Sequence, residues 1–383
     1  MILRLLPLAC SLALAAAPAA AATLSSEQTR RVAELKKIVG DPANDPMPPI
    51  EELAAMGEAG DRRLAEFTRV VLGNDRRTIE GDLAQVGDAA KLAAAEAALR
   101  TERAAARAVI KSLGKDTVKT AKEHYDRLAG MHEALDVVYA ARSRIATALA
   151  RRPRLLELLR RADPDDTRFE PADEERLASE ARAALGSGAD LPGLEGKLAE
   201  DDPRFQTWFY ACCRRVEAWN AQHRAIMSSG EWDNACAVNR YREYLGIMPY
   251  EIDPRLLQAA RKHTKEMVEL NYFGHSSPVK GRGSHTERMR LEGFKGGMSE
   301  NCAYGSGTGE GAFWQWFSSP GHHKNMAGGC SHFGVGQWGG VKWTQVFGNS
   351  KRLMLMSDEE RKAHAFAGEP LHPQDAVAVG PGR

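Results

Sequence analysis

Three short polar phrases toward the C-terminal end of the chain decide its fold. They read YFGHSSP at residues 272–278, SENCA at 299–303 and SSPGHHKNM at 318–326. Each phrase places an imidazole or a carboxylate beside glycine, proline or an amide. These neighbours determine the local backbone conformation: glycine permits unusual angles, proline fixes φ, and an amide side chain can hydrogen-bond to the main chain. Because ionisable groups are costly to bury without partners, three such phrases in one short stretch predict a polar cleft in a compact domain.

The residues around these phrases predict alternating helices and strands. One helix is expected over residues 235–245, and a second over 254–270 with Asp253 as its N-cap and a proline at its first position. Two β-prone runs, 333–338 and 341–347, flank a Gly-Gly pair and predict a hairpin. Helices with a small sheet indicate an α/β layered domain.

The part of the chain before this domain is predicted to be all-helical. Its composition is dominated by Ala, Leu, Arg and Glu, and Gly-Pro-Asp phrases separate the expected helices. We also interpret the pair Gly73-Asn74 as a helix break, and 205–226 as one aromatic-rich helix. A helical bundle is expected because one stretch carries apolar residues at helical spacing: Val118, Ala121, Tyr125, Leu128, Met131, Leu135 and Val138.

The N-terminus has the features of a secretory signal. Arg4 supplies a positive charge, an apolar run follows over residues 5–17, and small residues lead to a cleavage site expected near Ala22. A membrane anchor is the alternative, but the apolar run is short for a bilayer. With a net charge of +1, the chain has no broad basic surface for nucleic acid.

We therefore expect an exported protein, periplasmic or extracellular, with no transmembrane segment once the signal is removed. The expected organisation is a signal peptide at 1–22, a helical domain of unknown role at 23–230, an α/β domain at 231–350 and a flexible tail at 351–383.

Export makes disulfides permissible. If Cys10 leaves with the signal, five cysteines remain: Cys212, Cys213, Cys236, Cys302 and Cys330. We expect Cys302 to pair with Cys330, and either Cys212 or Cys213 to pair with Cys236. The odd count leaves one thiol free or bonded to another chain. Alternatively, Cys212 or Cys213 is a small buried apolar residue.

An ordered set of phrases across residues 231–350 resembles the CAP superfamily, in the form found in bacterial SCP domains. The set includes the three phrases above, Asn239-Arg240, Gly334-Val-Gly and Trp343-Thr-Gln-x-Phe-Gly. The family also contains cysteine-rich secretory proteins and plant pathogenesis-related proteins. The resemblance implies an α-β-α sandwich with a polar cleft, lined in many members by two histidines and two glutamates. The helical part before this region resembles no family we can name.

Residue by residue, the resemblance assigns two of the four cleft residues of the family. His275 matches the first family histidine, and Glu300 matches the glutamate of the Glu-Asn-x-Ala phrase. Lys342 stands where the second histidine is usual, and no glutamate follows Trp316 as it does in many eukaryotic members. We expect His322, from the bacterial phrase, to supply the missing imidazole.

Two imidazoles and a carboxylate can bind Zn²⁺ and leave a fourth position open. His275, His322 and Glu300 are therefore candidate ligands of a divalent cation such as zinc, which the resemblance also implies; no other cofactor is expected. The alternative is a buried hydrogen-bonded cluster in which Glu300 satisfies both imidazoles.

Several residues are expected to support the cleft or to lie outside it. Arg288 is expected to pair with an acidic group, Asn301 to hydrogen-bond the backbone, and Ser319 to cap a helix with its hydroxyl. The other histidines are assigned by their context in the sequence: His263 to the core, and His285, His323 and His332 to the surface.

We interpret the whole as a secreted, non-enzymatic binding module for a metal, lipid, cell-wall or protein ligand. A metal-dependent, peptidase-like hydrolase that uses the same cleft is one alternative. A structural envelope protein with a vestigial cleft is another. The sequence does not predict the oligomeric state.

Overall fold

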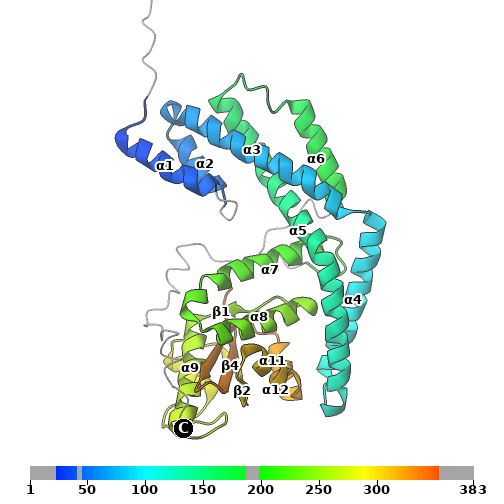
Figure 1. The fold of residues 1–383 in the computed structure, drawn as a ribbon, viewed down its shortest axis with the longest axis vertical. Helices are drawn as coiled ribbons and strands as arrows, with labels where there is room; N and C mark the ends of the chain where they lie inside the picture. The colour runs from blue at the N-terminus through cyan, green and yellow to red at the C-terminus, as the bar shows by residue number, and fades with distance from the viewer. Residues whose placement is uncertain (1–22, 41–44, 187–197, 353–383) are drawn as a thin grey trace, which may run out of the picture. The chain divides into compact units, whose positions relative to one another are not determined.

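The computed structural model describes residues 23–40, 45–186 and 198–352 (Figure 1). The expected signal peptide and all but the first two residues of the expected tail lie outside these residues. Contacts divide the chain into two compact units. One comprises residues up to Arg77 together with Ala148–Leu177, and the other comprises Thr78–Thr147 and the residues from Ala178 onward.

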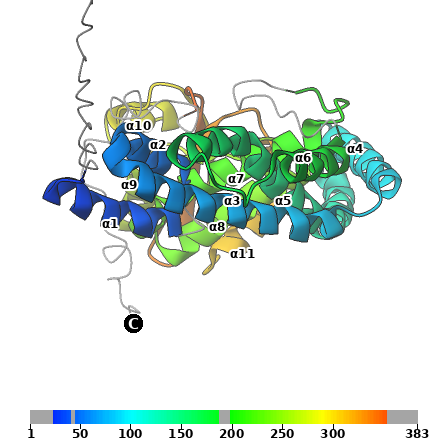
Figure 2. The same cartoon turned by 90° about the horizontal axis from the view of Figure 1, so that it is seen from above.

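The first unit is a helical cluster (Figure 2). It contains α1 (Ser26–Gly40), α2 (Met47–Ala55), most of α3 (Glu58–Val86), the end of α5 (Val118–Ala162) and the start of α6 (Pro171–Leu185). Its core is apolar and includes Leu35, Ile50, Leu53, Leu64, Leu155 and Leu158, none of them more than 1% exposed. The expected break at Gly73-Asn74 is wrong, because α3 continues through it. A single glycine costs a helix only about 1 kcal/mol, which the packing of that core offsets.

The second unit begins with the rest of α3, then α4 (Ala89–Lys111), the 3₁₀ turn η1 (Lys115–Thr117) and the main part of α5. The predicted apolar stripe of α5 is confirmed, since Ala121, Leu128 and Leu135 are buried in its core. The predicted helix at 205–226 is shorter: α7 spans Phe205–Ala221, and a separate turn η3 covers Arg224–Ile226.

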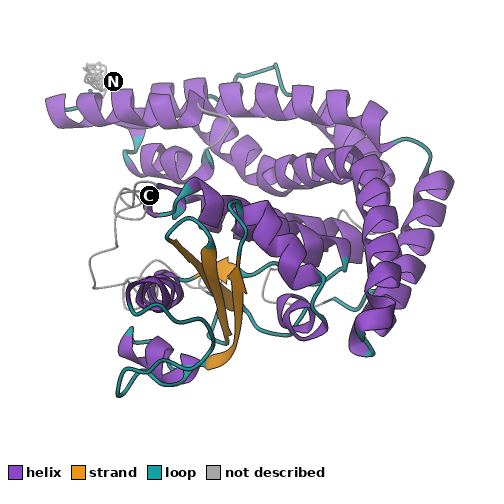
Figure 3. Ribbon diagram, turned by 60° about the horizontal axis from the view of Figure 1, so that its bottom comes forward, coloured by secondary structure: helices purple, strands orange, loops and turns teal. Residues whose placement is uncertain are grey.

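The same unit contains a four-stranded sheet between helices (Figure 3). Its strands are β1 (Glu251–Ile252), β2 (Gly297–Tyr304), β3 (His332–Trp338) and β4 (Lys342–Gly348), in the order β1-β3-β4-β2. β1 runs parallel to β3, whereas β3-β4 and β4-β2 are antiparallel. The predicted hairpin is confirmed, and Gly339 and Gly340 adopt φ of 62° and 78° at its turn, a region that glycine enters without steric cost.

Helices cover both faces of this sheet. On one face lie α9 (Pro254–Glu269) and α10 (His285–Leu291); on the other lie α8 (Ser229–Tyr244), α11 (Gly309–Phe317) and α12 (Pro320–Met326). The expected N-cap is confirmed, because the Asp253 side chain accepts from the backbone N–H of Arg255. Together with the helical first part of the chain, these layers confirm the predicted fold class of α plus α/β.

The close approach of α9 to β3 depends on glycine. A Cβ on Gly334 would lie 2.2 Å from the carbonyl carbon of Leu256, and one on Gly336 would lie 2.4 Å from the backbone nitrogen of Arg261. Both distances are far inside van der Waals contact, so only glycine fits at these two positions.

Candidate functional site

Glu300 is the centre of a buried charge cluster. It lies on β2, and because side chains alternate along a strand, Glu300 and Cys302 point toward the α9 and α10 side of the sheet. The Glu300 side chain is 1% exposed. Its Oε2 accepts a hydrogen bond from Nη2 of Arg288 at 2.7 Å, and its Oε1 lies 3.0 Å from Nδ1 of His275.

The surroundings keep Glu300 ionised. Burial by itself raises the pKa of this carboxyl, but the hydrogen bond from His275 and the charges of His263 and Arg288 outweigh burial, so the pKa is lowered. A buried carboxylate with an adjacent guanidinium forms a fixed negative group against which a neighbouring imidazole can orient.

The loop that carries His275 is held by main-chain contacts from charged side chains. Nη2 of Arg288 donates to the His275 carbonyl at 2.9 Å, and its Nη1 donates to the Arg282 carbonyl at 2.8 Å. Nζ of Lys342 donates to the carbonyls of Met267 at 2.7 Å and Tyr272 at 3.0 Å. Both ends of the loop are therefore tied to the sheet and to α10.

A second carboxylate fixes the middle of the loop. Glu266 of α9 accepts hydrogen bonds from the Tyr272 hydroxyl at 2.5 Å, from Nε of Arg282 at 2.7 Å, and from the Ser277 hydroxyl. His275 is consequently positioned by its whole loop and not by the Glu300 contact alone.

His275 is the accessible member of the cluster. Its side chain is 54% exposed. The hydrogen bond to Glu300 raises the pKa of the His275 imidazole more than burial lowers it. Since Nδ1 faces Glu300, Nε2 lies on the opposite side of the ring.

His322, the other imidazole predicted from sequence, lies beside His275. The two ring centroids are 6.2 Å apart. Burial and the charge of His275 lower the pKa of His322. No hydrogen bond between His322 and Glu300 is found among the described residues, so His322 faces His275 rather than the carboxylate.

Two residues that the sequence analysis did not assign to the cleft lie beneath it. His263 is fully buried, with Nε2 3.0 Å from the Gly274 carbonyl and 3.8 Å from Oε1 of Glu300. Sγ of Cys302 lies 3.6 Å from the same oxygen. Within the described residues, His263, Glu300 and Cys302 are the one group of possible metal ligands that converge within 4.8 Å. Spacing alone gave no sign of this, because His263 lies on α9 whereas Glu300 and Cys302 lie on β2.

The expected disulfides are not present in the structure: all five described cysteines are free thiols. Cys302 faces the α9 and α10 side of β2, whereas Cys330 packs with the core on the other side of the sheet. Cys212 and Cys213 are buried in a small aromatic core on α7, as the alternative interpretation expected of one of them, while Cys236 is part of α8. Burial and the nearby Glu300 carboxylate raise the pKa of the Cys302 thiol well above its usual range, which argues against a reactive thiolate.

The predicted supporting residues differ in their contacts. Arg288 forms the ion pair with Glu300 described above. Nδ2 of Asn301 donates to the His322 carbonyl at 3.1 Å, and its Oδ1 accepts from Asn325 at 2.8 Å, so this amide positions α12. Ser319 is the N-cap of α12, but its hydroxyl forms no capping hydrogen bond, contrary to expectation.

Two histidines expected at the surface are buried. His323 is fully buried, with Nδ1 2.7 Å from the Phe317 carbonyl and Nε2 2.6 Å from the Tyr241 hydroxyl. His332 is also fully buried, with Nε2 3.3 Å from Glu251. Both lie on elements whose burial the local sequence does not reveal. His285, also expected at the surface, is half-buried at the start of α10.

The layered fold is that of a CAP domain, and the family model of the cysteine-rich secretory protein family matches residues 236–346. The C-terminal part of the chain is therefore a CAP/SCP domain. It is similar to an uncharacterized protein, YkwD, of Bacillus subtilis (strain 168), with 37% identity over 112 residues. That match covers 28% of this chain and 43% of YkwD, so the chain matches less than half the length of this relative.

A solved structure of an extracellular protein containing a SCP domain from Bacillus anthracis str. Ames is also similar. It shares 22% sequence identity with a TM-score of 0.29, over 40% of this chain and 45% of that chain. None of the described helices combines the length and apolar character needed to cross a membrane.

Proposed function

We propose that the protein is an exported CAP-domain binding module whose site holds a divalent transition metal, zinc by preference, between His275 and His322. The observation that carries the proposal is the geometry of His275. A buried, ionised carboxylate holds Nδ1 at 3.0 Å, the side chain is 54% exposed, and a second imidazole lies beside it.

This arrangement fits a metal-binding histidine. Histidines that bind metals almost always donate their other ring N–H to a carboxylate or a carbonyl, which fixes the tautomer and the ring orientation. Glu300 has that role here, with Nε2 of His275 left as the ligand atom. His322 is predominantly neutral near pH 7 because its pKa is lowered, and a neutral imidazole is the form that binds metal.

Glu300 does not fit as a direct ligand. Both of its oxygens are occupied, one by Arg288 and one by His275, and its side chain is 1% exposed. A metal bound to Glu300 would have to displace a guanidinium from a buried pair. The proposed metal ligands are therefore the imidazoles of His275 and His322, with Glu300 as the hydrogen-bond partner of His275. The sequence had suggested all three residues as direct ligands.

A metal bound by two imidazoles keeps open coordination positions, which would accept a carboxylate, phosphate or carbonyl oxygen of a ligand. We propose a cell-envelope ligand, because the N-terminal sequence has the composition of an export signal. The exposed side of His275 makes the site accessible to a large molecule.

No observation favours the hydrolase alternative over binding. The buried Cys302 has a raised pKa, the opposite of what a nucleophilic thiol requires. Turnover of peptides or cell-wall fragments by the wild-type protein, absent from a folded Glu300→Gln variant, would favour the hydrolase instead.

Metal analysis tests the proposal. The purified protein, loaded with Zn²⁺ and desalted, is expected to retain about one equivalent, and a folded His275→Ala/His322→Ala variant is expected to lose it. His285→Ala is the matched control, because His285 lies in the same domain without contacting this pair. Equal zinc content in the double variant and the wild type would reject the site.

A further inference from the structure

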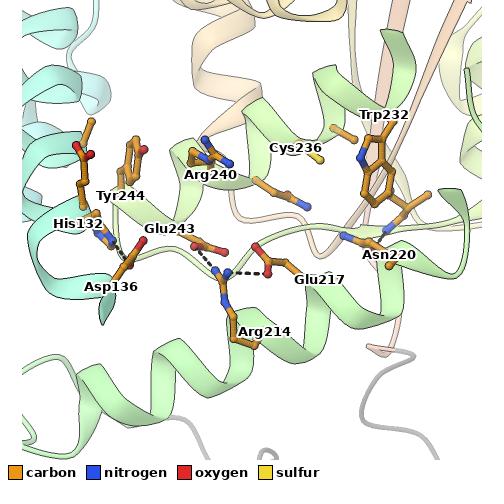
Figure 4. A pocket seen from close by; sticks show the side chains of 16 residues that line it. His132, Asp136, Arg214, Glu217, Asn220, Trp232, Cys236, Arg240, Glu243 and Tyr244 are labelled. Carbon is orange, nitrogen blue, oxygen red and sulfur yellow. Dashed lines mark hydrogen bonds and ion pairs between the residues drawn. The ribbon is translucent and has the colours of Figure 1, made fainter. Parts of the chain in front are cut away.

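A cavity lies between α5, α7 and α8, and its lining contains none of the residues of the His-Glu cluster. Its volume is about 650 Å³, within the size range of small-molecule pockets. Its wall is formed by α5, α7 and α8, with Ile252 of β1 (Figure 4). All of these residues belong to the second compact unit. None of them belongs to the His275 site.

Carboxylates outnumber cations inside this cavity. Asp136 of α5, Glu217 of α7 and Glu243 of α8 line it together with Arg214. Arg214 is shared, with one nitrogen 2.6 Å from Glu217 and another 2.7 Å from Glu243. Arg240, also in the lining, is exposed.

Asp136 has no positive partner at hydrogen-bond distance among the described residues. The nearest nitrogen is Nδ1 of His132, at 4.0 Å. Burial and the charge of Arg103 lower the pKa of His132 to about 3, so this imidazole is neutral at pH 7. The Asp136 side chain is 60% exposed, and it is therefore accessible to a ligand.

An inner chamber adds an independent observation. It is lined by Tyr139, Gln206 and Arg103 and shares His132, Asp136 and Glu243 with the main cavity. Tyr139 is 2% exposed, and its hydroxyl has no hydrogen-bond partner among the described residues. Buried hydroxyls are rarely left without one. The chamber holds about 10 Å³, enough for a water or for the end of an ammonium group.

The lining also contains apolar side chains, namely Trp232 and Ala235 of α8, Ala221 of α7 and Ile252 of β1. In Figure 4, Trp232 lies at one end of the row of labelled side chains, and Asp136 and His132 lie at the other, with Arg214, Glu217 and Glu243 between them. The cavity thus combines an apolar wall with a line of carboxylates.

We propose that this cavity binds a small organic cation, an aliphatic amine whose ammonium group contacts Asp136 and Glu243 and whose carbon chain lies along α8 toward Trp232. A bare metal ion fits less well. The carboxylates of the cavity are absent from the converging ligand groups found among the described residues, so they are too widely spaced to surround one ion. An ammonium group at Asp136 would also give the Tyr139 oxygen a donor.

The protonation of the carboxylates supports this assignment. Burial raises the pKa of Glu243 to about 7, with Glu217 and Asp136 adding to the effect of burial and Arg214 opposing it. Two further ionisable groups lie beside Glu243: Arg103, which donates to the Glu243 carbonyl, and His132, which is neutral at pH 7. A bound ammonium would lower the pKa of Glu243 and displace its proton, so amine affinity is expected to rise between pH 6 and pH 8.

Calorimetric titration of the full chain with 1,6-diaminohexane tests the proposal, with 1,6-hexanediol as the uncharged probe of equal length. The diamine is expected to bind saturably and the diol not at all. Asp136→Asn is expected to weaken diamine binding at least about tenfold, the range of a charge-assisted hydrogen bond. Asp136 is exposed and lacks a close ion pair, so this variant is expected to fold.

Glu217→Gln is a second test from another helix, and Asp126→Asn is the matched control, because Asp126 lies on α5 outside the cavity and pairs with Lys122. The proposal is overturned if the diol binds as tightly as the diamine, if no diamine binds at millimolar concentration, or if Asp136→Asn and Glu217→Gln both retain wild-type affinity. The His275 site takes no part in any of these measurements.

Discussion

Replacing Arg288 with methionine isolates the energetic cost of the buried Glu300 charge. Each of the two side chains is 1% exposed, and they meet at 2.7 Å. Removing one partner of a buried ion pair leaves an uncompensated charge and typically costs about 3–5 kcal/mol. Arg288 also donates to the carbonyls of His275 and Arg282. We therefore expect Arg288→Met to lose at least about 3 kcal/mol of unfolding free energy.

Tryptophan fluorescence during urea unfolding measures this loss in the second compact unit, which contains Arg288 and Glu300. All seven tryptophans lie between Trp208 and Trp343, within the second compact unit. The matched control is Arg290→Met, on the exposed side of the same helix α10, for which a change within about 0.5 kcal/mol is expected.

A double variant separates charge from packing. If the cost arises from the unpaired carboxylate, Arg288→Met/Glu300→Gln should be more stable than Arg288→Met alone, because replacing both members of a buried pair removes the stranded charge. A loss below about 1 kcal/mol for Arg288→Met, or a double variant that is less stable than the single one, would refute this reasoning.

Three further predictions concern titration and packing. Zn²⁺ must displace the proton of His275, whose pKa is raised, so zinc affinity should fall by up to about tenfold per pH unit below that pKa; an affinity constant from pH 8 to 5.5 would contradict this. Burial lowers the pKa of His323 to about 4. Between about pH 6.5 and pH 4 this histidine is therefore protonated in the unfolded state but neutral in the folded state, and about 3 kcal/mol of unfolding free energy is lost as the pH falls through this range. His323→Gln should show a smaller loss than wild type in urea unfolding at pH 7 and pH 4, and an equal loss would contradict the assignment. Gly336→Ala places a Cβ 2.4 Å from the nitrogen of Arg261 and should cost at least about 2 kcal/mol in the same assay, whereas Gly329→Ala, with open space around it, should cost little.

The hairpin and the helix beginning at Pro254 could be predicted because their signals are local. A Gly-Gly pair between β-prone runs and an Asp-Pro helix start act through their own backbone. β2 was not identified as a strand, since its sequence contains Glu300, Asn301 and Cys302, which satisfy their polar groups only through residues distant in sequence. The break expected at Gly73 failed for the related reason that the packing of α3 outweighs a weak local preference.

The candidate site was partly predictable for the same physical reason. His275 and Glu300 lie in phrases with a recognisable form, and the structure places them 3.0 Å apart. His263 was assigned to the core by its position on an apolar helix face, and it is buried. Its distance of 3.8 Å from Glu300, however, depends on how α9 packs against β2, which no spacing in the sequence encodes.

Lys342 links the end of α9 to the loop that carries His275. The position corresponds to a histidine in many members of the family that the C-terminal part resembles, but here Nζ donates to the carbonyls of Met267 and Tyr272. A lysine engaged by two carbonyls at the C-terminal end of α9 neutralises the partial negative charge there and anchors the loop of His275. Because its Nζ is engaged by these two carbonyls, Lys342 is not available as a metal ligand. In the proposed site the second imidazole is that of His322 on α12, where Asn301 donates to the His322 carbonyl at 3.1 Å, so the position of His322 depends on the same β2 strand that positions Glu300.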